Sequence, residues 1–330
     1  MKKTKKILCL VMFFSAVCSC LGIEKLDKKA ISAQNPSQLA RKIVLSALKN
    51  KNPRVRTSAI EVISAGKRIE FIGHIVKAMQ DPVVNVRFAA ALTSGDLNYL
   101  PAKEDIKKLL QDPDKNVAIA AAYAMVKLGQ GEYFQQIQAA ASDQNPTVAA
   151  NAAMLLGQLG DKQALPTLYG IKDNHNLPDV ATFNATEAIA KLGDQKIYSK
   201  IWTMLISAFA DDRYMGIIAM AQLKTPQAAN AIMTMLEDDI LEVRLTAAEK
   251  LGLFGNKSGE DIVLEHLANI GSLETEKSSR EPQDVIATLA IGTIGTEKLI
   301  SYLPKQLNNE SVLVRLAAAK SVFILEKQYR

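Results

Sequence analysis

Beyond residue 20 this chain of 330 residues contains no cysteine, since its three cysteines are Cys9, Cys18 and Cys20. The body therefore cannot be stabilised by an internal disulfide. A cysteine-free body suits a protein that enters an oxidising compartment, where stray thiols would be oxidised.

Histidine is also scarce, and His74, His175 and His266 lie far apart. The segment from Asp173 through His175 to Asp179 could gather three metal ligands, but zinc sites usually recruit cysteine or a second histidine. We interpret it as a solvated loop and expect no metal, no cofactor and no catalytic residue. The glycines of residues 252–258 lack the spacing of a phosphate-binding loop.

Aromatic residues make up only 5% of the chain, with Trp202 as the one tryptophan. Alanine and leucine dominate the periodic segments, which favours closely packed helices over strands.

The formal charge of +6 is concentrated at the start of the chain, and removing Lys2, Lys3, Lys5 and Lys6 lowers it to +2. The remainder has no block of consecutive basic residues that could follow a phosphate backbone. We therefore expect no nucleic-acid partner.

The first residues have the layout of a secretory signal: lysines, then an apolar run at 7–17 that is too short to span a bilayer, then small residues. The run Val17-Cys18-Ser19-Cys20 resembles the lipobox of bacterial lipoproteins, which implies cleavage after residue 19 and acylation of Cys20. We predict a signal peptide at 1–19 and a lipidated tether at 20–37. The resemblance implies a protein of the bacterial cell envelope, membrane-anchored and facing the periplasm or exterior. An ordinary signal peptide cut near the same point is the alternative.

A motif recurs along the rest of the chain at a nearly constant interval. Val55, Val86, Val117 and Val148 mark it with equal spacing, and aligning the Leu-Gly that follows continues the register at 181, 212, 243, 283 and 314. Each marked residue is called position 0 of its unit below. Asp or Asn followed by Pro, just ahead of it, supplies a helix cap and a first-turn proline. The pattern predicts pairs of helices, the second of which begins at the motif and buries positions 0, 4, 8 and 11.

The Asp-Pro-x-x-x-Val-Arg motif with an alanine-rich second helix resembles HEAT repeats, and the short unit is similar to the phycobilisome-lyase-like HEAT class. The resemblance implies an all-α fold, an α-solenoid of about nine helix pairs over residues 38–330 whose second helices line a concave face. In such repeats, the Arg of the motif and the Asp before Pro often form ladders between units. Ala118, Ala149 and Thr182 stand at the Arg position, so we expect the ladder to be interrupted in the middle.

Two enzymes resemble this repeat class. Deoxyhypusine hydroxylases carry His-Glu pairs that hold iron, and this chain has no His-Glu dipeptide. Phycobilin lyases share the repeat, but no lyase-specific residue maps onto the chain. We therefore expect a non-enzymatic scaffold or adaptor that binds another protein or peptide, with a phycobilin-lyase-like enzyme or enzyme subunit as the alternative.

Positions 2 and 6 of the second helices lie opposite the buried face, yet many of them are apolar. If the concave groove exposes them, Phe88, Tyr123, Met154, Phe183 and Tyr214 are candidate anchors for a partner. If curvature is tight, neighbouring units cover them instead. The interval from position 243 to position 283 is longer than the others, which predicts a longer loop near 269–283 that is either solvated or part of a binding face.

Overall fold

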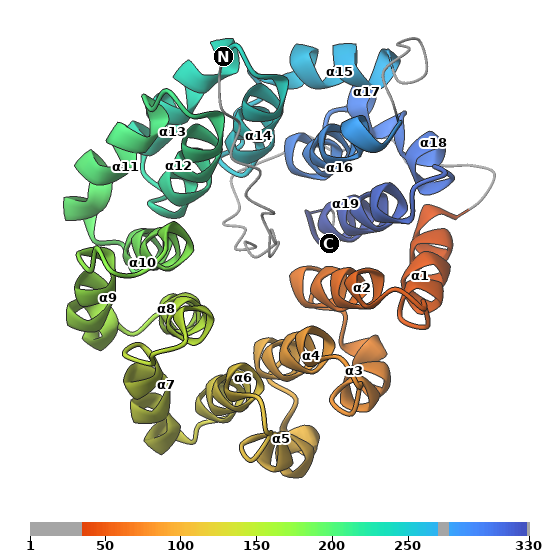
Figure 1. The fold of residues 1–330 in the computed structure, drawn as a ribbon. Coiled ribbons are helices and arrows are strands. Elements are labelled where there is room, and N and C mark those ends of the chain that lie inside the picture. The colour runs from red at the N-terminus through yellow and green to blue at the C-terminus, as the bar shows by residue number, and fades with distance from the viewer. Residues whose placement is uncertain (1–34, 270–276, 329–330) are drawn as a thin grey trace.

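The computed structural model describes residues 35–269 and 277–328, and within these ranges all regular secondary structure is helical. Helices alternate between an inner and an outer row (Figure 1). The inner row consists of α2 (Pro53–Ala65), α4 (Val84–Asp96), α6 (Lys115–Lys127), α8 (Pro146–Leu159), α10 (Asp179–Lys191), α12 (Ala210–Gln222), α14 (Leu241–Gly252), α16 (Lys277–Ile294) and α19 (Val312–Gln328). The outer row consists of α1 (Pro36–Ala47), α3 (Ile72–Ala78), α5 (Lys103–Leu109), α7 (Phe134–Ala140), α9 (Leu165–Lys172), α11 (Tyr198–Leu205), α13 (Pro226–Met233), α15 (Glu260–Ala268), α17 (Glu297–Ile300) and α18 (Leu303–Leu307). The predicted all-α solenoid of helix pairs is confirmed.

The repeated motif builds the start of α2 and α8 as predicted, because Asn52-Pro53 and Asn145-Pro146 supply the N-cap and the first-turn proline. For α4 and α6 this prediction is wrong: the Asp-Pro pair lies ahead of the N-cap, which is Val83 in α4 and Asp114 in α6. The side chains of Asn52, Asp114 and Asn145 each accept a backbone N–H at the first turn of α2, α6 and α8, which satisfies a donor that the helix leaves unpaired. Gly160 and Gly193 follow α8 and α10 with φ near 79°, a left-handed conformation that glycine adopts without strain.

One continuous core runs between the two rows of helices. Position 4 of the inner helices is buried throughout, and position 0 is buried except at Asp212, which is exposed, and Gln283, which is half-buried. In α8, for example, Val148 and Ala152 are buried in the same core as Leu168 of α9. Burying each branched aliphatic side chain contributes roughly 1.5–3 kcal/mol. Because every unit packs only on its neighbours, this core grows with the number of units.

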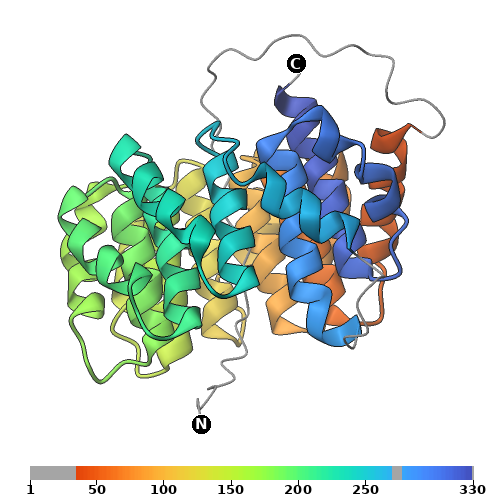
Figure 2. The same ribbon diagram turned by 90° about the horizontal axis from the view of Figure 1, so that it is seen from above.

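The two ends of the solenoid meet. The last inner helix, α19, packs against both α1 and α2, and the helices form a closed ring (Figure 1). Seen from the side, the inner and outer helices together form a single tier around the ring (Figure 2). The repeat pattern predicts the helix pairs and the inner face but not this closure.

Small residues bring neighbouring inner helices close together and so curve the chain. Position 9 is glycine in four units, and a Cβ atom added to Gly157 would lie 2.6 Å from the Cβ of Ala188 in α10. Gly95 and Gly292 have equally close backbone neighbours in the next unit. Because neighbouring helices of the inner row lie closer together than neighbouring helices of the outer row, each unit is rotated toward the ring centre relative to the one before it.

The seam where the ring closes is packed differently. Position 9 of α19 is Phe323, whose ring centroid lies 6.5 Å from that of Phe71 and 4.1 Å from the Arg68 guanidinium. Arg68 also donates hydrogen bonds to Glu70 (2.8 Å) and Glu326 (2.5 Å). An aromatic and ion-pair cluster thus joins the first and last units, at a position where four other units have a glycine.

Candidate functional site: the inner face of the ring

The inner face is formed by one side chain from each inner helix at position 6, and we call these nine residues the inner layer. Position 6 lies opposite positions 0, 4 and 8 on a helix, so it faces the ring centre rather than the core. The inner layer consists of Glu61, Leu92, Tyr123, Met154, Glu187, Ile218, Glu249, Leu289 and Lys320.

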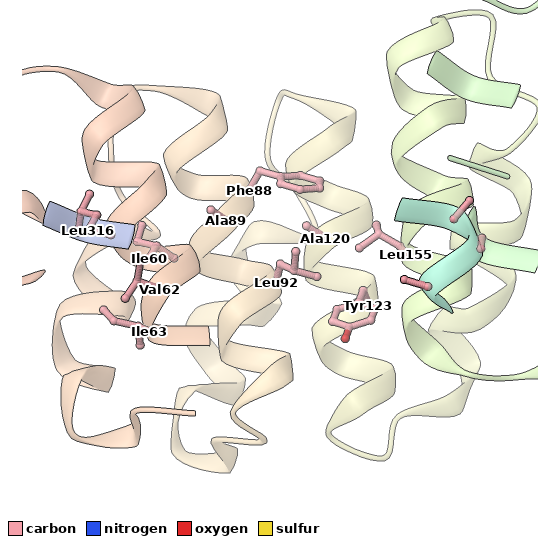
Figure 3. Close-up of a cluster of buried hydrophobic side chains, with 14 of the residues drawn as sticks. Ile60, Val62, Ile63, Phe88, Ala89, Leu92, Ala120, Tyr123, Leu155 and Leu316 are labelled. Carbon is pink, nitrogen blue, oxygen red and sulfur yellow. The ribbon is translucent and has the colours of Figure 1, made fainter. Parts of the chain in front are cut away.

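Two of the five predicted anchors are buried, so they cannot contact a partner. Phe88 and Tyr123 are 3% and 1% exposed, so the expectation of an exposed aromatic surface is wrong there. Phe88 lies at position 2, which points toward the neighbouring inner helix, and it belongs to the cluster of buried side chains that includes Leu92 of α4 and Ala120 of α6 (Figure 3). Tight curvature covers these side chains, which was the alternative interpretation of the sequence.

The other three predicted anchors, Met154, Phe183 and Tyr214, are half-buried on α8, α10 and α12. Their role in partner binding stays a prediction. They lie on neighbouring inner helices, because α10 packs against both α8 and α12, so the structure brings them to one arc of the inner face.

Tyr123 instead has a role in holding three inner helices together. Its hydroxyl donates to Asp96 Oδ1 at 2.5 Å, and the Ser64 hydroxyl donates to Asp96 Oδ2 at 2.7 Å. Burial and the neighbouring Asp96 carboxylate raise the pKa of Tyr123, so it remains a hydrogen-bond donor at physiological pH. The Tyr123 hydroxyl is therefore committed to linking α6, α4 and α2.

Charged side chains occupy the inner layer in four units, and the sequence-based prediction of an apolar inner face did not include them. Glu61 and Glu249 are buried, Lys320 is buried, and Glu187 is half-buried. The prediction used the apolar residues at position 6, although four of the nine residues at that position are charged. Counting the charged residues on the helix face that was expected to be exposed would have found them.

The environment of these charges shifts their titration. Burial raises the pKa of Glu61 to about 8, against the opposing effect of Lys320. Burial lowers the pKa of Lys320 to about 8, although Glu249 and Glu61 both favour its charged form. Burial also raises the pKa of Glu187, which accepts a 2.9 Å hydrogen bond from Gln222 Nε2. The inner layer thus carries carboxyl and amino groups that can change charge near neutral pH.

The ladder between units is present on either side of the middle units and interrupted within them, as predicted. Bidentate pairs join Arg56 to Asp81, Arg87 to Asp112 and Arg213 to Asp238, with N–O distances of 2.6–2.9 Å. Burial alone would raise the pKa of Asp112, but hydrogen bonds from Arg87 and from a backbone N–H together outweigh it, and the net pKa is lowered. These residues hold neighbouring units in register, so they belong to the scaffold.

The remaining polar candidates form no metal site in the described part of the chain, where no three His, Cys, Asp or Glu side chains gather to hold an ion. His266 Nε2 lies 2.8 Å from Asp284 Oδ1 and joins α15 to α16. The loop that contains His175 is exposed. The stretched interval is partly helical, because α16 already begins at Lys277 and contains Pro282.

Residues 1–34 and 270–276 lie outside the described residues, and so do the predictions for Cys20 and for the middle of the long loop. No helix in the described ranges is both long and apolar enough to cross a bilayer.

Comparisons with known proteins support the repeat class. Residues 148–171, which lie within α8 and α9, match the family model of the PBS lyase HEAT-like repeat, so this helix pair is similar to the phycobilisome-lyase-like HEAT class. None of the curated proteins compared with the chain matches it.

Solved structures with a similar arrangement are distant in sequence. Human deoxyhypusine hydroxylase in complex with glycerol is 16% identical with a TM-score of 0.39, covering 79% of this chain and 97% of its own. The complex of CpcE and CpcF of phycocyanin lyase from Nostoc sp. PCC7120 is 16% identical with a TM-score of 0.34, covering 93% and 100%. Kap121p is 13% identical with a TM-score of 0.35, covering 88% of this chain and 38% of its own. At these values the likeness concerns the helical-repeat fold alone.

Proposed function

We propose that this protein is a non-catalytic binding scaffold, lipid-anchored in the cell envelope, whose inner face holds a segment of another protein. The observation that supports binding is the charge of the inner layer. Leu92 and Ile218 show that an apolar side chain at position 6 is compatible with the fold. Burying a charged side chain instead costs free energy that its neighbours must offset; here Lys320 acts on Glu61, Lys250 lies 2.8 Å from Glu249, and Gln222 donates to Glu187. Glu187, which is half-buried, is also placed to meet a basic group of a ligand segment.

The half-buried apolar residues supply the other part of such a site. Met154 and Ile218 flank Glu187 around the inner layer, since α8, α10 and α12 are consecutive inner helices. A segment that places an apolar side chain against Met154 and Ile218, and a basic side chain against Glu187, would complement this arc. Buried apolar contacts with one desolvated charge pair are the pattern of energetically important interface residues.

Photo-crosslinking in intact cells tests this site. A photoreactive residue at Ile218 is expected to give a discrete protein adduct, and Glu187→Gln is expected to reduce it. Glu132→Gln is the matched control, because Glu132 is exposed in the short helical turn between α6 and α7. Circular dichroism of each variant separates loss of binding from loss of folding. An adduct that forms equally from exposed Gln135 on α7, or that ignores Glu187→Gln, would contradict the proposed site.

The lipid anchor has its own test. Cys20 stands at the end of the lipobox-like run, ahead of the described chain, which begins at Asn35. Incorporation of labelled palmitate is expected in the parent chain and in Cys18→Ala, and is expected to be lost in Cys20→Ala. Retention of label in Cys20→Ala would contradict the anchor without affecting the binding site.

The second candidate is a phycobilin-lyase-type enzyme or enzyme subunit, favoured only by the repeat model that residues 148–171 match. It predicts that the purified protein carries or transfers a bilin, visible in its absorption spectrum. The scaffold proposal predicts no visible absorption band on the protein once it is separated from the free pigment with which it was incubated.

A further inference from the structure

An apolar patch lies on α11 and the turn that follows it, at the outer circumference in Figure 1. Large apolar side chains are also exposed elsewhere in the described residues, such as Met233 of α13 and Leu100, but only α11 and its turn bring three of them within eight residues. On α11 and its turn, the exposed fractions of Trp202, Ile206 and Phe209 are 37%, 64% and 66%. We call these three residues the α11 patch.

The fold does not require the α11 patch. Ile201 and Leu205 already bury the inner side of α11. Phe209 occupies the N-cap of α12 without a capping hydrogen bond; Val83 and Ile240 occupy the same place ahead of α4 and α14, also without one, but they are half-buried. At 66% exposure, the Phe209 ring gains little from burial within the monomer. Large apolar side chains that stay this exposed on one helix and its turn point to contact with something outside the monomer.

The charges around the α11 patch run from positive to negative along the helix. Lys196 is exposed in the turn before α11 and Lys200 in its first turn, whereas Asp211 and Asp212 are exposed after Phe209, in the first turn of α12. A second copy laid antiparallel on the patch would place each lysine end against the aspartate end of the other. Such self-complementarity is what a two-fold symmetric interface requires. An anionic membrane surface, in contrast, would be repelled at the Phe209 end.

We propose that two copies of this chain associate through the α11 patch, with α11 antiparallel to its counterpart, Trp202 and Ile206 in the apolar centre, and Lys196 facing Asp211 of the second copy. Thr203 lies on the exposed side of α11 midway between these charges, so it lies near the two-fold axis. The patch is small, and interfaces of this size are reversible. The association leaves the inner face of each ring open.

Disulfide trapping of the full chain tests the dimer. Thr203→Cys places a thiol near the axis, while the native cysteines all lie in residues 1–20. Mild oxidation is expected to give a species of twice the monomer mass that is absent from the parent chain. Gln135→Cys, an exposed position on α7, is the matched control and is expected to stay monomeric.

Charge reversal then tests the orientation in the Thr203→Cys background. Lys196→Glu or Asp211→Lys alone is expected to lower trapping by about tenfold, because each creates two like-charge contacts in a symmetric pair and about 1.4 kcal/mol corresponds to tenfold. The double variant is expected to restore trapping, which a misfolded chain could not do. Trapping no greater than in Gln135→Cys, failure of the double variant to restore it, or a product containing a different protein would overturn the proposal.

Discussion

Replacing Phe323 with alanine should open the ring at its seam. Phe323 is buried between Phe71, Gly66 and Arg68, and truncating a buried phenylalanine costs about 3–5 kcal/mol. The cation–π contact with Arg68 is lost in the same truncation. Because the seam joins only the first and last units, this loss falls on one interface, and the remaining units keep their neighbours.

Hydrogen exchange shows which helices lose stability in Phe323→Ala. Amides of α1, of α2 and of α19 are expected to exchange about a hundred- to thousandfold faster in Phe323→Ala, since about 1.4 kcal/mol corresponds to tenfold. Phe88→Ala is the matched control, because Phe88 is an equally buried phenylalanine away from the seam. Its effect should fall on α4 and α6 instead. If both variants speed exchange evenly around the ring, the seam is not an independent interface and the reasoning is wrong.

Two further predictions concern the inner helices. Between about pH 4.5 and 8 the folded chain holds a proton on Glu61 that the unfolded chain releases, so the free energy of unfolding should fall as pH rises through this window. Above pH 8 the folded chain has lost the proton on Lys320 that the unfolded chain still holds, so the free energy of unfolding should rise with pH. Urea unfolding at several pH values should show a minimum of stability near pH 8. Glu61→Gln should reduce the fall between pH 5 and 8, to which Glu187 also contributes; an unchanged slope would show that Glu61 is not a source of it. Gly157→Ala should destabilise the protein by roughly 1–3 kcal/mol because the added Cβ meets Ala188, whereas Gly170→Ala, with nothing within 4 Å, should stabilise it by roughly 0.5–1 kcal/mol; equal effects in thermal unfolding would contradict the close approach.

The sequence was sufficient for the units because each unit is determined locally. A capping Asn145, a first-turn Pro146 and a closing Gly160 define α8 without reference to the rest of the chain. The ladder of Arg–Asp pairs between units could be predicted equally well, since it depends on one arginine and one aspartate per unit. These features repeat, so an error in one unit is corrected by the others.

Ring closure could not be predicted in the same way, because it depends on the sum of small rotations between units. The contact of Gly157 with Ala188 sets one such rotation, but no single contact reveals the total. The burial of Phe88 and Tyr123 at the inner face could not be predicted for a related reason. Whether Phe88 points to the ring centre or to the next helix depends on curvature, and the sequence pattern places positions 2 and 6 on the same side.

Closure also fixes how many units the protein can contain. A linear solenoid can gain or lose a unit at little cost, provided that polar units cover its two ends. Here the first and last units cover each other, and Phe323 fits only the partner surface around Phe71 and Arg68. Duplicating or deleting one unit would leave either a gap or a clash at that surface. The protein should therefore change in evolution by substitution within units and by loop insertion, while its repeat number stays constant.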